Sequence, residues 1–154
     1  MSTQPNSQQQ FFIQLAKHKF KIEAVLTALA LAAWFVGEPQ ELLQFTLFAL
    51  AAFYFISAYL ISSVKELFGV VATKVSGIGG AVCLTGLVFM KLGMEGWMQM
   101  LLVGFLSMVP VVLILLFYWM KSHNTEYLIL IIRSTALAII TGYIVIPQLQ
   151  NLEG

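Results

Sequence analysis

Long apolar runs constrain this sequence more than any other feature, because they are long enough to cross a lipid bilayer as helices. The stretch from Trp97 to Met120, for example, contains no charged residue, and about 20 apolar residues span the hydrocarbon core of a membrane. Only 10% of the 154 residues are charged, against about 25% in a soluble domain. A soluble fold of this size could not bury so much apolar surface. The sequence therefore predicts an all-α, polytopic helical membrane protein.

Five apolar runs are expected to form transmembrane helices. Their expected bounds are Ile22–Val36, Leu42–Val64, Val75–Leu92, Trp97–Met120 and Tyr127–Ile146. Leu67–Thr73 is expected to connect the second and third runs. The first run resembles a signal-peptide core, but no clear cleavage site follows Trp34, so we interpret it as a retained span. Because this run is short for a bilayer, a four-span arrangement in which it lies on the membrane stays open.

Proline and capping residues indicate where these helices end or bend. Pro39 and Pro147 are expected to end helices, because proline cannot continue the backbone hydrogen bonding. Pro110 lies near the middle of the fourth run and predicts a kink. Asn124 or Thr125 is expected to cap the start of the fifth helix.

The chain is expected to form one membrane domain with short flanks. Residues 1–10 are polar and expected to be disordered. Residues 11–21 mix aromatic side chains with lysines, which indicates either an amphipathic helix in the membrane interface or a simple extension of the first span. Residues 22–147 are expected to form the helical bundle, and residues 148–154 a short tail.

The distribution of cations predicts the orientation, since cytoplasmic segments of membrane proteins are enriched in lysine and arginine. If the N-terminus is cytoplasmic, Lys91 alone among the lysines falls on the outer side. The lysines on the inner side are then Lys17, Lys19, Lys21, Lys65, Lys74 and Lys121. The sequence therefore predicts a cytoplasmic N-terminus and, with five spans, an external C-terminus.

The first two expected helical hairpins are similar to each other. Val36–Gln40 joins the helices of the first hairpin, Leu92–Gly96 joins those of the second, and each hairpin begins with a lysine, Lys21 or Lys74. The two hairpins would run in the same direction. A duplication would therefore be parallel, unlike the inverted repeats of many transporters. Chance likeness between two apolar hairpins is the alternative.

Small residues line one face of the third run. They recur at helical spacing and are Ser76, Gly79, Gly80, Cys83 and Gly86. Small side chains let helix backbones approach closely inside a membrane. The face is therefore a predicted packing seam, either within one subunit or at an oligomer interface, and a glycine-lined pore is the alternative.

Three charged residues are candidates for a site inside the membrane. Arg133 lies about two turns, or roughly 10 Å, inside the fifth run, where a cation usually faces a partner or a wet cavity. Glu23 and Glu126 are its candidate partners, and Glu126 lies seven residues earlier on nearly the same helix face. Alternatively, Arg133 extends to the membrane interface, and Glu23 forms a surface pair with a nearby lysine.

The sequence contains no motif for catalysis, a cofactor or a metal. Cys83 is the single cysteine, and His18 and His123 fall in polar segments, which leaves too few ligands for a metal site. No nucleophile with a positioned base and no phosphate-binding loop is recognisable. A net charge of +1 gives no basic field for nucleic acid. We therefore expect no enzymatic activity, no cofactor and no nucleic-acid partner.

The stretch from Lys74 to Phe117 combines a glycine-rich helix, Phe-x-Lys, a glycine-containing turn and Met-Leu-x-x-Gly. The residues concerned are Lys74, Gly77, Gly79, Ala81, Val82, Gly86, Phe89, Lys91, Gly93, Gly96, Met100, Leu101 and Gly104. This stretch resembles the membrane hairpin of the small inner-membrane motor subunit of the type IX secretion and gliding machinery. That family carries an acidic residue in its second helix, whereas Gly104–Pro110 contains none. The resemblance therefore implies a bacterial inner-membrane scaffold and not a motor.

These observations predict a non-enzymatic, multi-pass subunit of a bacterial cytoplasmic (inner) membrane. It would contact the lipid bilayer and pack into a homo-oligomer or with other membrane subunits. The alternative is a small transporter or channel that uses Arg133 and the glycine face of the third helix.

Overall fold

Every regular element of the protein is a helix in the residues that the computed structural model describes, 7–37, 39–60 and 66–150. The helices are α1 (Ser7–Val36), α2 (Gln40–Ser57), α3 (Leu67–Leu92), α4 (Trp97–Ser122) and α5 (Thr125–Gln150). The predicted all-α fold is confirmed.

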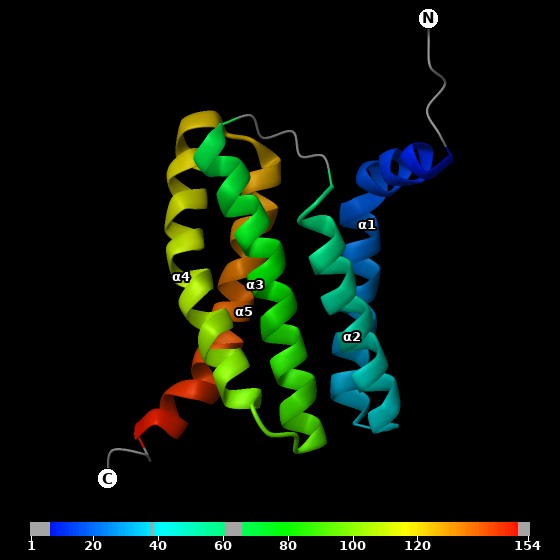
Figure 1. Cartoon of the computed structure of the whole chain (residues 1–154), viewed down its shortest axis with the longest axis vertical. Coiled ribbons are helices and arrows are strands. Elements are labelled where there is room, and N and C mark those ends of the chain that lie inside the picture. The colour runs from blue at the N-terminus through cyan, green and yellow to red at the C-terminus, as the bar shows by residue number, and fades with distance from the viewer. Residues whose placement is uncertain (1–6, 38, 61–65, 151–154) are drawn as a thin grey trace, which may run out of the picture.

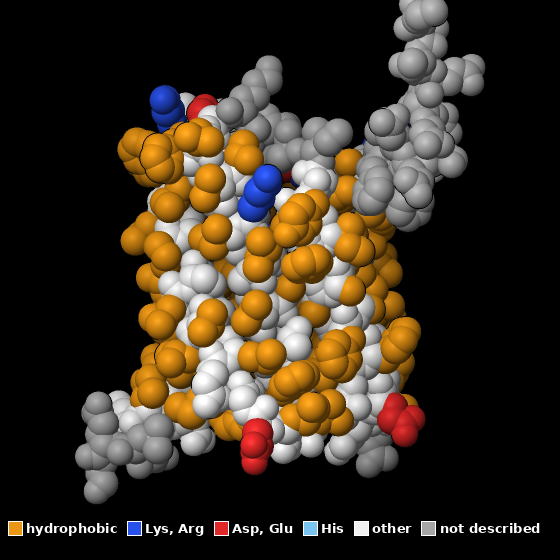
Figure 2. Space-filling model, viewed as in Figure 1, with side chains coloured by type: hydrophobic (Ala, Val, Ile, Leu, Met, Phe, Trp, Pro, Cys, Tyr) orange, Lys and Arg blue, Asp and Glu red, His pale blue; other side chains and the backbone are white. Residues whose placement is uncertain are grey.

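Helices α2, α3, α4 and α5 are each long and apolar enough to cross a membrane. Their outward-facing side chains are large and apolar: Phe45 is 73% exposed, Leu113 64% and Ile139 66%. Hydrophobic side chains cover most of the visible surface in Figure 2. In water, an apolar surface of this extent would drive association, whereas a bilayer is a suitable solvent for it. The prediction of a polytopic helical membrane protein is confirmed.

Helix α1 differs from the other four. Within the described residues, α1 does not meet the requirement of length and apolarity that the other four helices meet. Its lysines and Glu23 limit its longest apolar stretch to Ala24–Val36. The predicted interfacial segment is continuous with this helix, and Figure 1 shows the first turns of α1 bent away from the rest. The expected disorder of residues 1–10 is wrong from Ser7 onward, because Gln8–Gln10 are good helix formers next to an apolar segment. Residues 1–6 lie outside the described residues.

The connector expected at Leu67–Thr73 is instead the first part of α3. Gly69 and Ala72 continue the buried face of that helix, so packing extends it beyond the bounds that hydropathy predicts. In contrast, α2 ends at Ser57 and not at Val64. The Ser57 hydroxyl donates a hydrogen bond to the Tyr54 carbonyl oxygen, and the next residues form turns, which is a common way for serine to compete with helical bonding. Residues 61–65 lie outside the described residues.

Pro147 does not end α5, which continues to Gln150. Proline is tolerated inside membrane helices at the cost of a bend, and Figure 1 shows the last turns of α5 turning away from the bundle. Residues 148–150 of the expected tail are therefore helical, and residues 151–154 lie outside the described residues. At the other end of α5, the Asn124 side chain accepts a hydrogen bond from the Glu126 backbone N–H over 2.9 Å. The predicted cap at Asn124 is confirmed.

Helix α3 is the central helix of the bundle. It packs against α2, α4 and α5, whereas α1 packs against α2. Figure 1 shows α1 and α2 side by side as one hairpin, next to a group formed by α3, α4 and α5. The turns after α1 and α3 both begin with a glycine in a left-handed conformation, Gly37 at φ 75° and Gly93 at φ 65°. This feature is shared by the two hairpins whose sequences are similar.

The small face of α3 makes this central position possible. A Cβ atom at Gly86 would lie 2.8 Å from the Leu101 side chain, and one at Gly80 would lie 2.8 Å from the Tyr54 ring. Separations this short are far inside van der Waals contact. The five small residues of this face are buried within the chain, so the structure places the seam inside the subunit.

Gly104 of α4 provides a test of this packing. A Cβ atom there would overlap the Cys83 sulfur and lie 3.2 Å from the Cys83 backbone nitrogen. We expect Gly104→Leu to lower the free energy of unfolding by about 1–3 kcal/mol, the usual effect of overpacking, measured as a lower melting temperature in detergent by tryptophan fluorescence. Val103→Leu, at a 59% exposed neighbouring position, is the control and should melt like the wild type. Equal melting temperatures for both variants would contradict the packing at this position.

Candidate functional site

Arg133 joins four helices inside the bundle. Its Nη1 atom lies 3.4 Å from Glu23 Oε1 on α1, and its Nη2 atom donates a hydrogen bond to Ser76 Oγ on α3 over 2.8 Å. The guanidinium carbon lies 4.4 Å from the centre of the Tyr54 ring on α2, a cation–π distance. Arg133 itself is 9% exposed. The structure therefore holds the guanidinium inside the protein and does not extend it to the surface.

A second polar contact continues from this residue into the packed core. Ser76 Oγ and Ser134 Oγ lie 2.8 Å apart, and both serines are completely buried. Because Ser76 accepts from Arg133, its hydroxyl proton is available for Ser134. The small residue Ser76 thus has two functions: it lets α3 pack closely, and it holds one nitrogen of the guanidinium in place.

A second ion pair links α1 to α5 nearer the start of α5. Lys19 Nζ contacts Glu126 Oε1, and Glu126 is 7% exposed. Lys19 and Glu23 are four residues apart, so they share one face of α1. Along α1 the cation comes before the acid, whereas along α5 the acid comes before the cation. Each cation therefore lies opposite an acid, and the two ion pairs form next to each other.

Sequence reasoning named Glu23 and Glu126 as candidate partners of Arg133. The structure brings Glu23 to Arg133 and gives Glu126 a different partner, Lys19. The signal that could have indicated this pairing is the reversed order of charges on the two helices. This order predicts the pairing only if the two helices lie near each other, and nothing in the sequence shows that they do.

The charges of this group, which we call the ion-pair cluster, balance each other. The cluster consists of Lys19, Glu23, Glu126 and Arg133, two cations and two carboxylates, with Tyr54, Ser76 and Ser134 as neutral neighbours. Burying an unpaired charge is very costly, and pairing removes most of that cost. The cluster therefore fits an apolar environment as long as its net charge stays near zero.

One donor of the cluster has no partner among the described residues. The Nε atom of Arg133 is buried and makes no hydrogen bond there. A buried donor left without an acceptor costs about 1–3 kcal/mol, and more when it is charged. The Arg133 Nε–H group can therefore donate one further hydrogen bond, for example to an oxygen of a small anion or of water.

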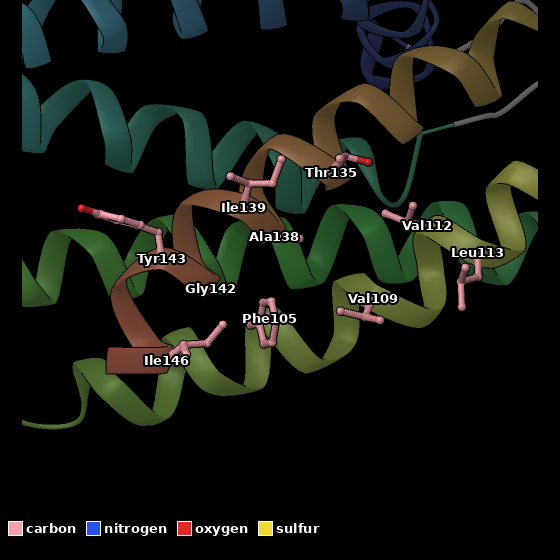
Figure 3. A pocket seen from close by; sticks show the side chains of 10 residues that line it. All are labelled: Phe105, Val109, Val112, Leu113, Thr135, Ala138, Ile139, Gly142, Tyr143 and Ile146. Carbon is pink, nitrogen blue, oxygen red and sulfur yellow. The ribbon is translucent and has the colours of Figure 1, made fainter. Parts of the chain in front are cut away.

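An apolar groove of about 380 Å³ lies between α4 and α5 (Figure 3). Gly142 lies close to the Phe105 ring, and Tyr143 stands beside the groove with 82% of its surface exposed. The lining residues are Phe105, Val109, Val112, Leu113, Thr135, Ala138, Ile139, Gly142, Tyr143 and Ile146. These α5 residues lie on the helix face opposite to Arg133, so the groove is separate from the ion-pair cluster.

The remaining candidate residues have local structural contacts. Cys83 is buried against Gly104. His123 ends α4 in a left-handed conformation with φ 51°, and its backbone N–H bonds to the Trp119 carbonyl oxygen. Within the described ranges, no group of three or more potential metal ligands is found.

Comparisons of this chain with protein-family models, with curated proteins and with solved structures find no match.

A double-mutant cycle tests the pairing of Arg133 with Glu23. Arg133→Met alone should destabilise the protein by about 3–5 kcal/mol, because it leaves the Glu23 carboxylate buried without its partner. Adding Glu23→Gln to Arg133→Met should restore part of this loss, with a coupling free energy of about 0.5–3 kcal/mol. The measurement is the unfolding free energy of the four proteins in detergent. Strictly additive effects would show that the two residues do not interact.

Proposed function

We propose that this protein is a small, non-enzymatic membrane carrier that binds an anionic solute at Arg133. The supporting observation is the unpartnered Nε atom on a guanidinium that is buried among four helices. Ionisable residues inside membrane proteins commonly mark solute or ion pathways. Arg133 is also well suited to an anion, because its planar guanidinium offers several donors in a fixed geometry.

The arrangement of the helices supports a carrier mechanism. α1 is joined to α5 by the two ion pairs and packs against α2, which in turn packs against α3. An ion pair can exchange one partner for another of the same charge, whereas a packed apolar interface cannot. We infer that an entering anion competes with Glu23 for Arg133, and that this exchange lets α1 shift relative to α5.

We place this carrier in a bacterial cytoplasmic membrane with a cytoplasmic N-terminus. Lys74 and Lys121 lie near the end of the bundle where α5 begins, and Glu41 and Glu95 lie at the opposite end. Figure 2 shows cationic side chains near its upper end and acidic ones at its lower end, with an acidic group also beside the cations. This asymmetry supports the orientation. The bacterial source rests on the resemblance of Lys74–Phe117, and α1 would form a fifth span.

Uptake by reconstituted vesicles tests the carrier. Purified protein in lipid vesicles should take up at least one of three labelled anions: lactate, glutamate or inorganic phosphate. We expect Arg133→Lys to lower uptake at least tenfold, because lysine keeps the positive charge but lacks the planar set of donors. Lys74→Gln, at an exposed cation of α3, is the matched control and should transport normally. Size-exclusion chromatography verifies that each variant is folded. If none of the three anions enters above the level of protein-free vesicles, the proposal is wrong.

A second candidate is an assembly subunit, and the α4–α5 groove favours it. Of the four candidate spans, α4 is the most apolar and the least buried within the chain. Small residues such as Ala138 and Gly142 line the groove, and small residues allow close packing of a further helix. The proposed occupant is a second copy of this chain, because the same groove on two copies can form a two-fold interface.

Native mass spectrometry from mild detergent tests this second candidate. A dimer should be observed, and Tyr143→Ala should weaken it at least tenfold in Kd, which is about 1.4 kcal/mol, because tyrosine is enriched among the residues that contribute most to interface affinity. Tyr59→Ala, at a 65% exposed position outside the groove, should leave the dimer intact. A monomer that carries bound lipid would rule out self-association through this groove.

A further inference from the structure

We propose that the end of α1, the start of α2 and the end of α3 form a binding site for the headgroup of an anionic phospholipid, with Lys91 as the residue that binds its phosphate. This site is separate from Arg133 and does not depend on the carrier function. It is based on a polar pocket at one end of the bundle, on the position of Lys91 in that pocket, and on the level at which this end lies in a membrane.

A pocket of about 170 Å³ lies where α1 ends, α2 begins and α3 ends. Among the described residues the backbones of α1 and α3 do not pack on each other, which leaves this space between their ends. Its volume exceeds the 10–15 Å³ or so that one water molecule needs and is below the roughly 300–1,000 Å³ of pockets for drug-sized ligands. The pocket therefore suits a small polar group. The lining residues are Trp34, Gly37, Gln40, Leu43, Gln44 and Lys91.

Lys91 supplies the charge of this pocket. Its Nζ atom lies 4.6 Å from the centre of the Trp34 ring, a cation–π distance. This contact holds the ammonium at the wall of the pocket without neutralising it. The ion pairs among the described residues do not include Lys91, and none of the lining residues is acidic. The pocket therefore presents one positive charge to a ligand.

Gln40 and Gln44 supply the hydrogen-bonding groups. They are four residues apart on α2, so their side chains share one face of that helix. Each side-chain amide offers two N–H donors and one carbonyl acceptor. A phosphodiester carries one negative charge, which matches the single ammonium, and its oxygens accept hydrogen bonds from ammonium and amide groups. The amide oxygens remain available for hydroxyl groups of the ligand.

The place of the pocket in a membrane favours a lipid over free phosphate. Helices α2 and α3 are both long and apolar enough to cross a bilayer, and Figure 1 shows the turns after α1 and after α3 at the same end of the molecule. Tryptophan is enriched at the level of the headgroups. Exposed apolar residues adjoin the lining residues in the sequence, such as Phe35 at 84% and Leu92 at 45% exposure. They can contact acyl chains, which free phosphate lacks.

The charges at this end of the bundle favour an anionic headgroup over a zwitterionic one. The ammonium of phosphatidylcholine would meet the like charge of Lys91, which already covers a face of the Trp34 ring. Phosphatidylglycerol has the same phosphodiester but carries hydroxyl groups in place of the ammonium. Glu41 and Glu95 are exposed at this end and oppose a diffuse attraction of anionic lipids. A preference for phosphatidylglycerol here would therefore come from the pocket itself.

Native mass spectrometry of the full chain in detergent tests the site, with phosphatidylglycerol and phosphatidylcholine that carry the same acyl chains. The wild type should bind the first phosphatidylglycerol at least fivefold more tightly than the first phosphatidylcholine. Lys91→Gln should lose about fivefold in affinity for phosphatidylglycerol alone, since one lysine near an anionic lipid surface contributes about this factor. Lys91→Arg keeps the charge and should keep the preference. Lys74→Gln, at an exposed cation at the other end of α3, is the matched control and should bind like the wild type.

Three results would overturn the proposal. Equal affinities of the wild type for the two lipids would show that the pocket does not select an anionic headgroup. Full affinity for phosphatidylglycerol in Lys91→Gln, or a loss in Lys74→Gln alone, would place the bound lipid elsewhere. Displacement of the lipid by an excess of inorganic phosphate would show that the pocket binds free phosphate. Size-exclusion chromatography verifies that each variant is folded, and a failure of anion uptake by vesicles would leave this site unaffected.

Discussion

A guanidinium inside an apolar helical bundle must find its compensating charges and acceptors within the protein, because a bilayer offers none at that depth. Arg133 meets this requirement with one partner from each of three other helices: Glu23 from α1, Tyr54 from α2 and Ser76 from α3. The positions of four helices are therefore coupled to one side chain. Any displacement of α1 or α2 relative to α5 has to change the partners of Arg133.

Close packing around α3 is the second constraint on the structure, after charge compensation at Arg133. Inside a membrane, helices are not pressed together by exclusion of water, so close contact between backbones has to provide the attraction. Gly79, Gly80 and Gly86 provide it by leaving space for side chains of α2, α4 and α5. This use of the small residues has a functional consequence. A face that is filled from within the chain is not free to contact another subunit.

The two sites on which the functional proposals rest have different chemistry. The ion-pair cluster is small, charged and enclosed, and its unpartnered donor suits an anion. The α4–α5 groove is open, apolar and directed outward, which suits another helix. The residues of the two sites lie on opposite faces of α5, so a carrier that also forms a dimer is physically consistent. Arg133 is buried inside the bundle, whereas Tyr143 is exposed on the outside of α5.

Much of the fold follows from the sequence alone, because hydropathy and helix periodicity are local properties. They determine the all-α class, the membrane character, the α4 start at Trp97, the α3 end at Leu92 and the cap at Asn124. They also identify Glu23 and Arg133 as charged residues in or next to apolar segments, where a charge is costly to bury. Local patterns fail where packing decides. The apolar start of α3 was expected to be a connector, but its buried residues Gly69 and Ala72 pack as part of the helix. Pro147 was expected to end α5, but the helix continues through an exposed last turn to Gln150.

The pairing of charges could be decided by the tertiary structure alone. The sequence shows opposite charge orders on the segments that become α1 and α5, but it contains no information on which segments lie side by side. Once α1 packs on α2, and α2 on α3, Lys19 reaches Glu126 and Glu23 reaches Arg133. The sequence thus determined which residues are costly to bury, since that depends on side-chain chemistry. The tertiary structure decided how the cost is met, since compensation depends on distances between residues more than 100 positions apart.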